Sequence, residues 1–94
     1  MVKHIVIYTL QEGCDKSEAV SFIADCLEPL VGKIPGLQHM EVRRTCLGDM
    51  DYVLYSEFES VQALQAYQGH PLHLEAKDKF HHLIATRVCG DYEI

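Results

Sequence analysis

The densest group of side chains capable of chemistry lies in the segment Tyr67-Gln68-Gly69-His70-Pro71-Leu72-His73. Imidazole gains and loses a proton near neutral pH, and enzymes use it more often than any other side chain as a general base. A neighbouring phenol, such as that of Tyr67, can orient an imidazole or polarise a carbonyl group. These residue types are suited to moving a proton on a small molecule.

A metal site is a second chemistry that the histidines could support. His70 and His73, together with His81 or His82, supply enough imidazoles for one ion. However, no Cys and His residues occur at the spacing of zinc ligands, and the adjacent His81 and His82 point to different sides of a helix. The sequence also has no nucleotide-binding glycine motif, no serine nucleophile elbow and no CxxC. We therefore expect neither a metal nor another cofactor.

The overall charge and the apolar runs argue against two classes of partner. The chain has 14 acidic residues and 8 Lys or Arg residues, and the net charge of −6 argues against binding to nucleic acid. No apolar run approaches the roughly 20 residues that a membrane-spanning helix needs. The 4 cysteines are scattered along the chain, which is typical of reduced thiols and predicts a cytoplasmic protein.

Length and composition predict a single globular domain over residues 1–94. Hydrophobic residues make up 48% of the chain, a fraction too high for a disordered protein. A domain of this size buries only roughly 60–65% of the surface of its unfolded chain. A partner subunit often supplies the stability that such a small core lacks.

Four segments are predicted to form strands. Lys3–Leu10 and Tyr52–Glu59 are rich in β-branched and aromatic residues and are apolar on both faces, which predicts that both faces are covered. A further strand is predicted at Leu37–Leu47. The last strand is predicted at Leu83–Cys89, with Gly90–Ile94 as a tail.

The first helix is predicted to begin after Asp15, a residue suited to capping a helix. Apolar residues then recur at helical spacing as far as Ile34. Pro29 interrupts this pattern, and we expect it to kink the helix or to end its first part near Glu28.

Two shorter helices are predicted between the last two strands. Ser60 can cap a helix that continues to Tyr67 or Gln68. Pro71 is suited to the first position of a further short helix. The residues of this helix that are expected to point inward are Leu72, Ala76, Phe80 and Leu83.

The element order β-α-β-β-α-β is that of a ferredoxin-like α+β domain, in which helices pack on one face of a four-stranded antiparallel sheet. The other face is left bare, and Ile5, Ile7, Val53 and Tyr55 would lie on it. A bare apolar face of this kind is usually an interface. We therefore expect a homodimer in which two sheets pack face to face.

Short motifs occur in a distinctive order over nearly the whole chain. They are Lys3-His4-Ile5-Val6, Ile34-Pro35-Gly36-Leu37, Phe58-Glu59-Ser60, His70-Pro71-Leu72-His73 and Asp91-Tyr92-Glu93. In this order they resemble the stress-responsive A/B barrel family, also called Dabb. The resemblance implies a dimeric α+β barrel. It does not imply one activity, because many members have no assigned chemistry, whereas plant members include stress-induced proteins and a polyketide cyclase.

The resemblance to the cyclase implies roles for individual residues. His73 would be the general base, Tyr67 its orienting or polarising partner, and His4 a wall of the ligand pocket. The cyclase has a histidine early in its third strand, where this chain has Tyr52. Tyr52 and His70 are expected to complete the pocket.

Each of these residues also has a purely structural interpretation. His4 can be a hydrogen-bonded histidine of the core, His70 can support the turn before the next helix, and Tyr67 can pack its ring inside. The nearby carboxylates of Glu75 and Asp78 could raise the pKa of His73 by stabilising the imidazolium ion, which would suit an acid better than a base.

Three functions remain compatible with the sequence. The chain could bind a small apolar molecule in a pocket of each protomer. It could be a cofactor-independent cyclase or lyase that uses His73 and Tyr67, or a related oxygenase. It could also be a non-catalytic stress protein that acts through assembly. A fold shared with characterised proteins does not decide among them.

Overall fold

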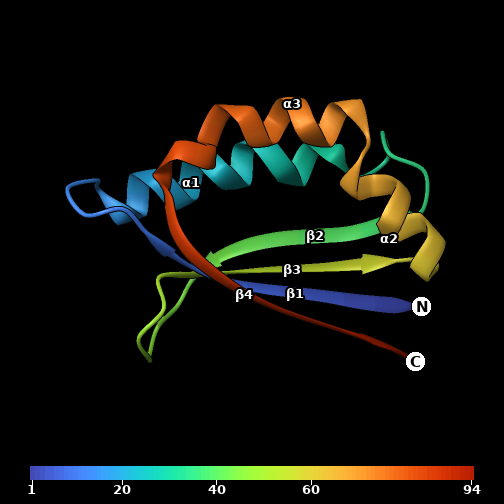
Figure 1. The fold of residues 1–94 in the computed structure, drawn as a ribbon, viewed down its shortest axis with the longest axis horizontal. Helices are drawn as coiled ribbons and strands as arrows, with labels where there is room; N and C mark the ends of the chain where they lie inside the picture. Colours follow the sequence, from blue (N-terminus) through green and yellow to red (C-terminus); the bar gives the residue numbers. More distant parts are fainter.

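A computed structural model describes residues 1–94 as one four-stranded antiparallel sheet with helices on one face (Figure 1). This arrangement confirms the ferredoxin-like α+β fold predicted from the sequence. Short 3₁₀ turns follow α1, over Glu28–Leu30, and α3, over His81–Leu83. The elements in chain order are β1 (Val2–Leu10), α1 (Lys16–Leu27), β2 (Leu37–Arg44), β3 (Tyr52–Phe58), α2 (Val61–Gln68), α3 (Pro71–Phe80) and β4 (Ile84–Glu93).

The sheet has the strand order β2-β3-β1-β4, so β1 and β3 are central and β2 and β4 are edge strands. All neighbouring strands are antiparallel, and Val6 of β1 lies opposite Leu54 of β3 on one side and Cys89 of β4 on the other. The two chain ends meet beside each other, where the Met1 amino group donates to the Ile94 carbonyl oxygen over 3.0 Å.

The last strand is longer than the sequence indicated. Gly90–Ile94 was expected to be a tail, yet β4 continues to Glu93 and places Asp91 opposite His4. Gly and Asp have low β-propensity, and this is why the pattern appeared to end at Cys89. The side of β1 that faces β4 presents backbone donors and acceptors along its whole length. Hydrogen bonds to them outweigh the low β-propensity of Gly90 and Asp91.

The first helix ends where proline requires it to. The Asp15 side chain accepts a hydrogen bond from the Glu18 backbone N–H over 2.9 Å, which confirms the predicted N-cap. The α-helix stops at Leu27 because Pro29 lacks a backbone N–H, and the chain continues as a 3₁₀ turn. By contrast, β2 is shorter than predicted and ends at Arg44.

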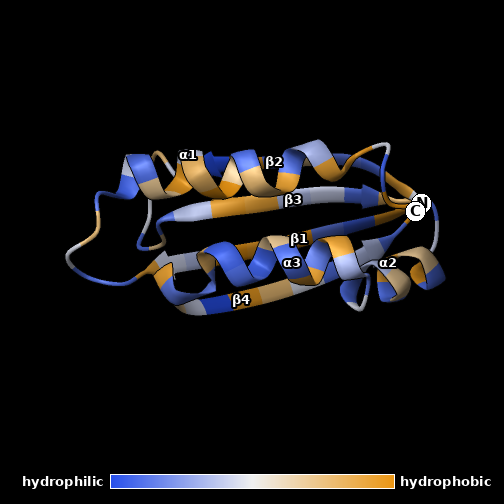
Figure 2. Cartoon of the chain, turned by 90° about the horizontal axis from the view of Figure 1, so that it is seen from above, coloured by the Kyte–Doolittle hydropathy of each residue, from blue (hydrophilic) through white to orange (hydrophobic).

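The core lies between the helices and the inner face of the sheet. Viewed from above, α1 and α3 run side by side along the sheet, and α2 lies at one end (Figure 2). Ala76 and Phe80 of α3 point inward as predicted, whereas Leu72 is exposed at the start of the helix. No helix is long and apolar enough to span a membrane.

No helix covers the outer face of the sheet (Figure 1). Ile5, Ile7, Val53 and Tyr55 are all partly exposed on this face, as the alternation of side chains along the strands requires. Val88 of β4 adds a side chain that is 58% exposed. The outer face is therefore an apolar surface without a partner inside the chain.

Candidate ligand pocket

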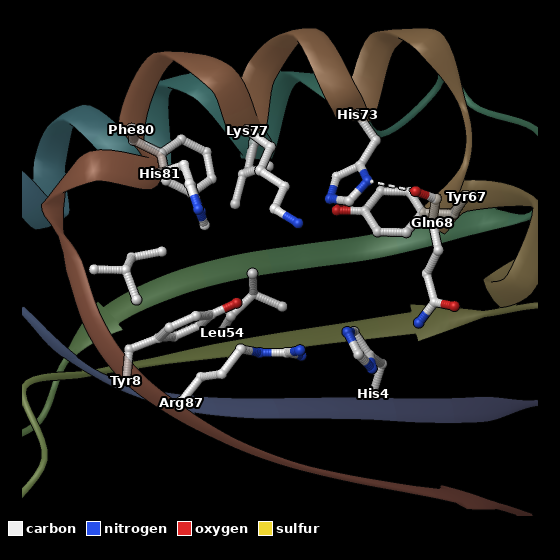
Figure 3. Close-up of a pocket in the computed structure, with 12 residues that line it drawn as sticks. His4, Tyr8, Leu54, Tyr67, Gln68, His73, Lys77, Phe80, His81 and Arg87 are labelled. Atoms are coloured by element: carbon white, nitrogen blue, oxygen red, sulfur yellow. Dashed lines mark hydrogen bonds between the residues drawn. The ribbon is translucent and has the colours of Figure 1, made fainter.

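A cavity of about 270 Å³ lies between α3 and the inner face of the sheet (Figure 3). Its volume is close to the lower end of the range of small-molecule sites, roughly 300–1,000 Å³. The apolar part of the wall is made by Leu27, Leu54, Phe80 and Ile84 together with the Tyr8 ring. The polar part comes from β1, α2, α3, the turn after α3 and β4.

His73 reaches the cavity from the first turn of α3. Pro71 begins this helix, and the His70 Nδ1 atom caps it by accepting from the Leu72 backbone N–H over 3.1 Å. The His73 Nδ1 atom lies 3.3 Å from the Gln68 carbonyl oxygen. Because a carbonyl only accepts, Nδ1 carries the hydrogen, and in the neutral ring Nε2 is left as a proton acceptor.

The surroundings of His73 favour its neutral form. Burial lowers the pKa of His73, the charge of Lys77 lowers it further, and the hydrogen bond to Gln68 opposes both effects. The expectation that Glu75 and Asp78 raise this pKa is wrong, because both carboxylates are exposed on the other sides of α3 and do not act on the ring. A neutral imidazole is the form that can act as a base.

Tyr67 stacks against His73. The centroids of the two rings are 4.2 Å apart and their planes are tilted by 32°. Burial strongly raises the pKa of Tyr67, so its hydroxyl keeps its proton at neutral pH. Figure 3 shows this hydroxyl pointing into the cavity beside His73, where it can donate a hydrogen bond to an oxygen atom of a ligand.

His4 faces the same cavity from β1 and is only 5% exposed. Its Nδ1 atom lies 2.6 Å from the Asp91 Oδ1 atom, because the strand register places the two residues opposite each other. A carboxylate only accepts, so this contact keeps the hydrogen of a neutral His4 on Nδ1 and frees Nε2. The interpretation of His4 as a hydrogen-bonded core residue and its interpretation as a pocket wall are therefore both consistent with the geometry.

Asp91 is a site residue that sequence reasoning missed. It lies in the predicted tail, although the alternation of Arg87, Cys89 and Asp91 places polar groups at every second position, as in a strand with one polar face. That alternation was the signal that could have revealed it. The partner of Asp91 lies at the opposite end of the chain, so no local pattern could connect them.

One group of side chains has the atoms for a metal ion. The Cys89 Sγ atom lies 3.9 Å from His4 Nδ1 and 3.6 Å from Asp91 Oδ1, and all ligand atoms are within 4.8 Å of one another. The contact of 2.6 Å between His4 and Asp91 is shorter than the roughly 3.3 Å between two ligands of a tetrahedral zinc ion. The group as it stands is a hydrogen-bonded pair beside a thiol. This group does not include His70, His73, His81 or His82, the histidines that the sequence offered as metal ligands.

Two of the expected pocket residues do not line the cavity. Tyr52 is fully buried and stacks on Tyr8, with ring centroids 4.5 Å apart, so that Tyr8 stands between it and the cavity. His70 is absent from the cavity wall, and its ring caps α3. The structure thus brings together His4, Tyr67 and His73, and it leaves Tyr52 and His70 outside.

Lys77 and Arg87 also reach the cavity, from α3 and β4 respectively (Figure 3). Sequence reasoning singled out neither residue, because long charged side chains are usually solvated and no motif surrounds them. Their side chains face each other only because the sheet places β4 below α3.

The comparison with protein families identifies the chain. The sequence model of the stress responsive A/B barrel domain matches residues 2–94. The chain belongs to this family. A comparison with curated proteins finds no match.

Solved structures share the fold of this A/B barrel protein. A dimeric protein of unknown function from Bacteroides fragilis has a TM-score of 0.88 and 28% identity, over 99% of this chain and 95% of that one. The Arabidopsis thaliana protein At3g17210 has a TM-score of 0.86 and 21% identity, over 100% and 95% of the two chains. A hydroxynitrile lyase from Passiflora edulis has a TM-score of 0.81 and 21% identity, over 99% and 92%. The last two likenesses concern the fold alone.

Proposed function

We propose that this A/B barrel protein binds a small, largely apolar molecule in its cavity and transfers a proton on it without a cofactor, as a cyclase or lyase does. The observation that carries the proposal is the convergence of His4, Tyr67 and His73 on one cavity with an apolar wall. These residues come from three separate elements of the chain. Each presents a group that is fit for acid–base chemistry.

The proposed step is the removal of a proton from a carbon atom next to a carbonyl group. The proton passes to Nε2 of neutral His73, and the electron pair of the C–H bond moves onto the carbonyl oxygen, which becomes an enolate. The Tyr67 hydroxyl stabilises that oxygen by donating a hydrogen bond. Protonated His73 then returns a proton to the enolate carbon, which regenerates the neutral base, while the bare Nε2 atom of His4, oriented by Asp91, can accept a hydrogen bond from the substrate.

We further propose that the protein is a homodimer whose two sheets pack face to face. The support is the apolar outer face of the sheet, with Ile5, Ile7, Val53 and Tyr55 near its centre. The similar protein from Bacteroides fragilis is dimeric. Pairing through a two-fold axis would cover the same patch on both copies.

Proton transfer can be tested without knowledge of the natural substrate. Benzylacetone is a small apolar ketone, and the exchange of its α-protons for deuterium in heavy water is followed by NMR. We expect the wild type to accelerate exchange over buffer, and His73→Ala to slow the catalysed rate by about 100-fold or more. Tyr67→Phe should also slow it, while ketone binding, measured by calorimetry, is retained.

His82→Ala is the matched control, because His82 is exposed and lies outside the cavity. It should exchange like the wild type. Binding of the ketone by the wild type with exchange no faster than in buffer would contradict the proposed proton transfer. The protein would then bind the ketone without catalysing proton transfer.

A further inference from the structure

The cavity carries positive charge in a protein that is acidic overall. The chain has a net charge of −6, yet the residues lining the cavity include Lys77, Arg87 and three histidines and no Asp or Glu. Only 8 of the 94 residues are Lys or Arg. Two of these basic residues point into one small cavity from different elements. The cavity is therefore locally positive, unlike the protein as a whole.

Neither cation in the cavity is neutralised by the protein. Lys3, Lys16 and Arg43 each lie within 2.8 Å of a carboxylate oxygen, whereas Lys77 and Arg87 have no carboxylate within ion-pair distance. Asp91 is on the same strand as Arg87, but its carboxylate is held by His4. Two like charges that face one cavity repel each other and favour an anion between them.

We infer that the ligand of this cavity is an amphipathic carboxylic acid, whose carboxylate lies between Lys77 and Arg87. This inference rests on the proposed function, since it names the class of molecule that the same cavity would bind. The guanidinium group of Arg87 can hold both carboxylate oxygens, and the Lys77 ammonium can meet the same group from the other wall. The Tyr8 hydroxyl lies beside Arg87 at this place (Figure 3).

The rest of the cavity fits the other parts of such a molecule. Phe80, Ile84 and Leu54 form an apolar part of the cavity wall that is suited to a hydrocarbon tail. Phe80 lies on one side of the two cations (Figure 3). On the other side, His73 is one helical turn from Lys77, a rise of roughly 5.4–6 Å along α3. A carboxylate bound at Lys77 therefore lies within about one helical turn of the proposed base.

The test compares acids with amides of the same shape. Octanoate and octanamide form one pair, and hydrocinnamate and hydrocinnamamide form a second pair with an aromatic tail. Binding to the wild type is measured by calorimetry at neutral pH, at low and at high salt. We expect each acid to bind at least about tenfold more tightly than its amide, because each cation forms a charge-assisted hydrogen bond. This preference should shrink at high salt.

Variants of the cations locate the carboxylate. Lys77→Met and Arg87→Met should each weaken binding of the acids about tenfold and leave binding of the amides within about twofold. Lys79→Met is the matched control, because Lys79 is on the same helix but is exposed and outside the cavity. It removes the same charge and should leave the preference for acids unchanged.

The outcomes separate this inference from the proposed function. Equal binding of acid and amide, or an unchanged preference in both Lys77→Met and Arg87→Met, would overturn the inference and leave the cavity as a site for neutral apolar molecules. An absence of binding for all four probes would overturn the proposed function, and the inference with it.

Discussion

In both His73 and His4 the Nδ1 atom is hydrogen-bonded, but the two acceptors differ in charge. The Gln68 carbonyl is neutral, whereas the Asp91 carboxylate is charged. Burial is the largest effect on His73 and lowers its pKa, although the hydrogen bond to the Gln68 carbonyl opposes it. Neutral His73 therefore offers its Nε2 atom to the cavity as the candidate base.

The depressed pKa of His73 predicts the pH dependence of catalysis and of its NMR signals. His73 should titrate below the ordinary histidine value of about 6.5. A base is active when it is unprotonated, so proton transfer should rise with pH through the pKa of His73 and be flat near neutrality. Histidine NMR titration, with His73→Gln to assign the signal, measures this pKa directly. A His73 signal that titrates above about 6.5 would contradict the prediction.

The same shift makes folding stability depend on pH. The unfolded chain binds a proton to His73 more readily than the folded chain, because the folded pKa is the lower one. The contribution of His73 is therefore complete above about pH 6.5 and is lost as the pH falls through the folded pKa. We expect His73→Gln to lose less stability than the wild type between pH 7 and pH 5, as measured by urea unfolding. An equal loss of stability in the two proteins would contradict this prediction.

Asp91 is predicted to fix the tautomer of His4. In Asp91→Ala the buried Nδ1–H loses its acceptor, which should destabilise the fold by about 1–3 kcal/mol. The hydrogen should also move in part to Nε2, which nitrogen-15 NMR detects. Removal of the proton acceptor from the cavity should then slow α-proton exchange.

Glu41→Ala provides the comparison for Asp91→Ala. Glu41 lies 2.9 Å from His39 in a pair whose side chains are 47% and 40% exposed. Because solvent screens that pair, its removal should change the stability by less than about 1 kcal/mol. Similar losses in the two variants would mean that the contact between His4 and Asp91 has no special weight.

At the scale of elements, Gly36 sets how closely the loop before β2 approaches α2. Its φ angle is +84°, and a Cβ atom placed there would lie 2.5 Å from the Ala63 Cβ. Gly36→Ala should therefore carry both backbone strain and a steric clash, and destabilise the protein by about 2–4 kcal/mol.

Gly48→Ala separates the two effects in the same measurement. Gly48 has a φ angle of +99° but no atom within 4 Å of an added Cβ. Only the strain remains, which should cost about 1–2 kcal/mol in urea unfolding. If Gly36→Ala were no more destabilising than Gly48→Ala, the packing of the loop on α2 would not be tight.

At the scale of the whole molecule, the outer face of the sheet predicts assembly. Ile7→Asp places an unpaired charge near the centre of the proposed interface, and burial of that charge is strongly unfavourable. We expect sedimentation to show a dimer for the wild type at micromolar concentration, and a monomer or an unfolded chain for Ile7→Asp. Gln65→Asp, on an exposed position of α2, should remain dimeric. A folded wild-type monomer at that concentration would refute the interface.

The amino-acid sequence by itself determined the order of the elements and the side chains near each other along the chain. Asp15, Pro29 and Pro71 mark helix ends through local backbone chemistry, which acts within a few residues. Tyr67 and His73 could be paired from the sequence because a short helix–turn–helix segment holds both. The two-faced strands likewise follow from the alternation of side chains.

Only the tertiary structure decided how the two ends of the chain meet at the cavity. His4 and Asp91 are 87 positions apart, and the pairing of β1 with β4 brings them into contact. Tyr52 stays outside because the Tyr8 ring stacks over it. Lys77 and Arg87 face each other because α3 packs above the edge of the sheet. The register of backbone hydrogen bonds and the packing of helices on the sheet set these distances. Neither can be read from the residues around any one of these positions.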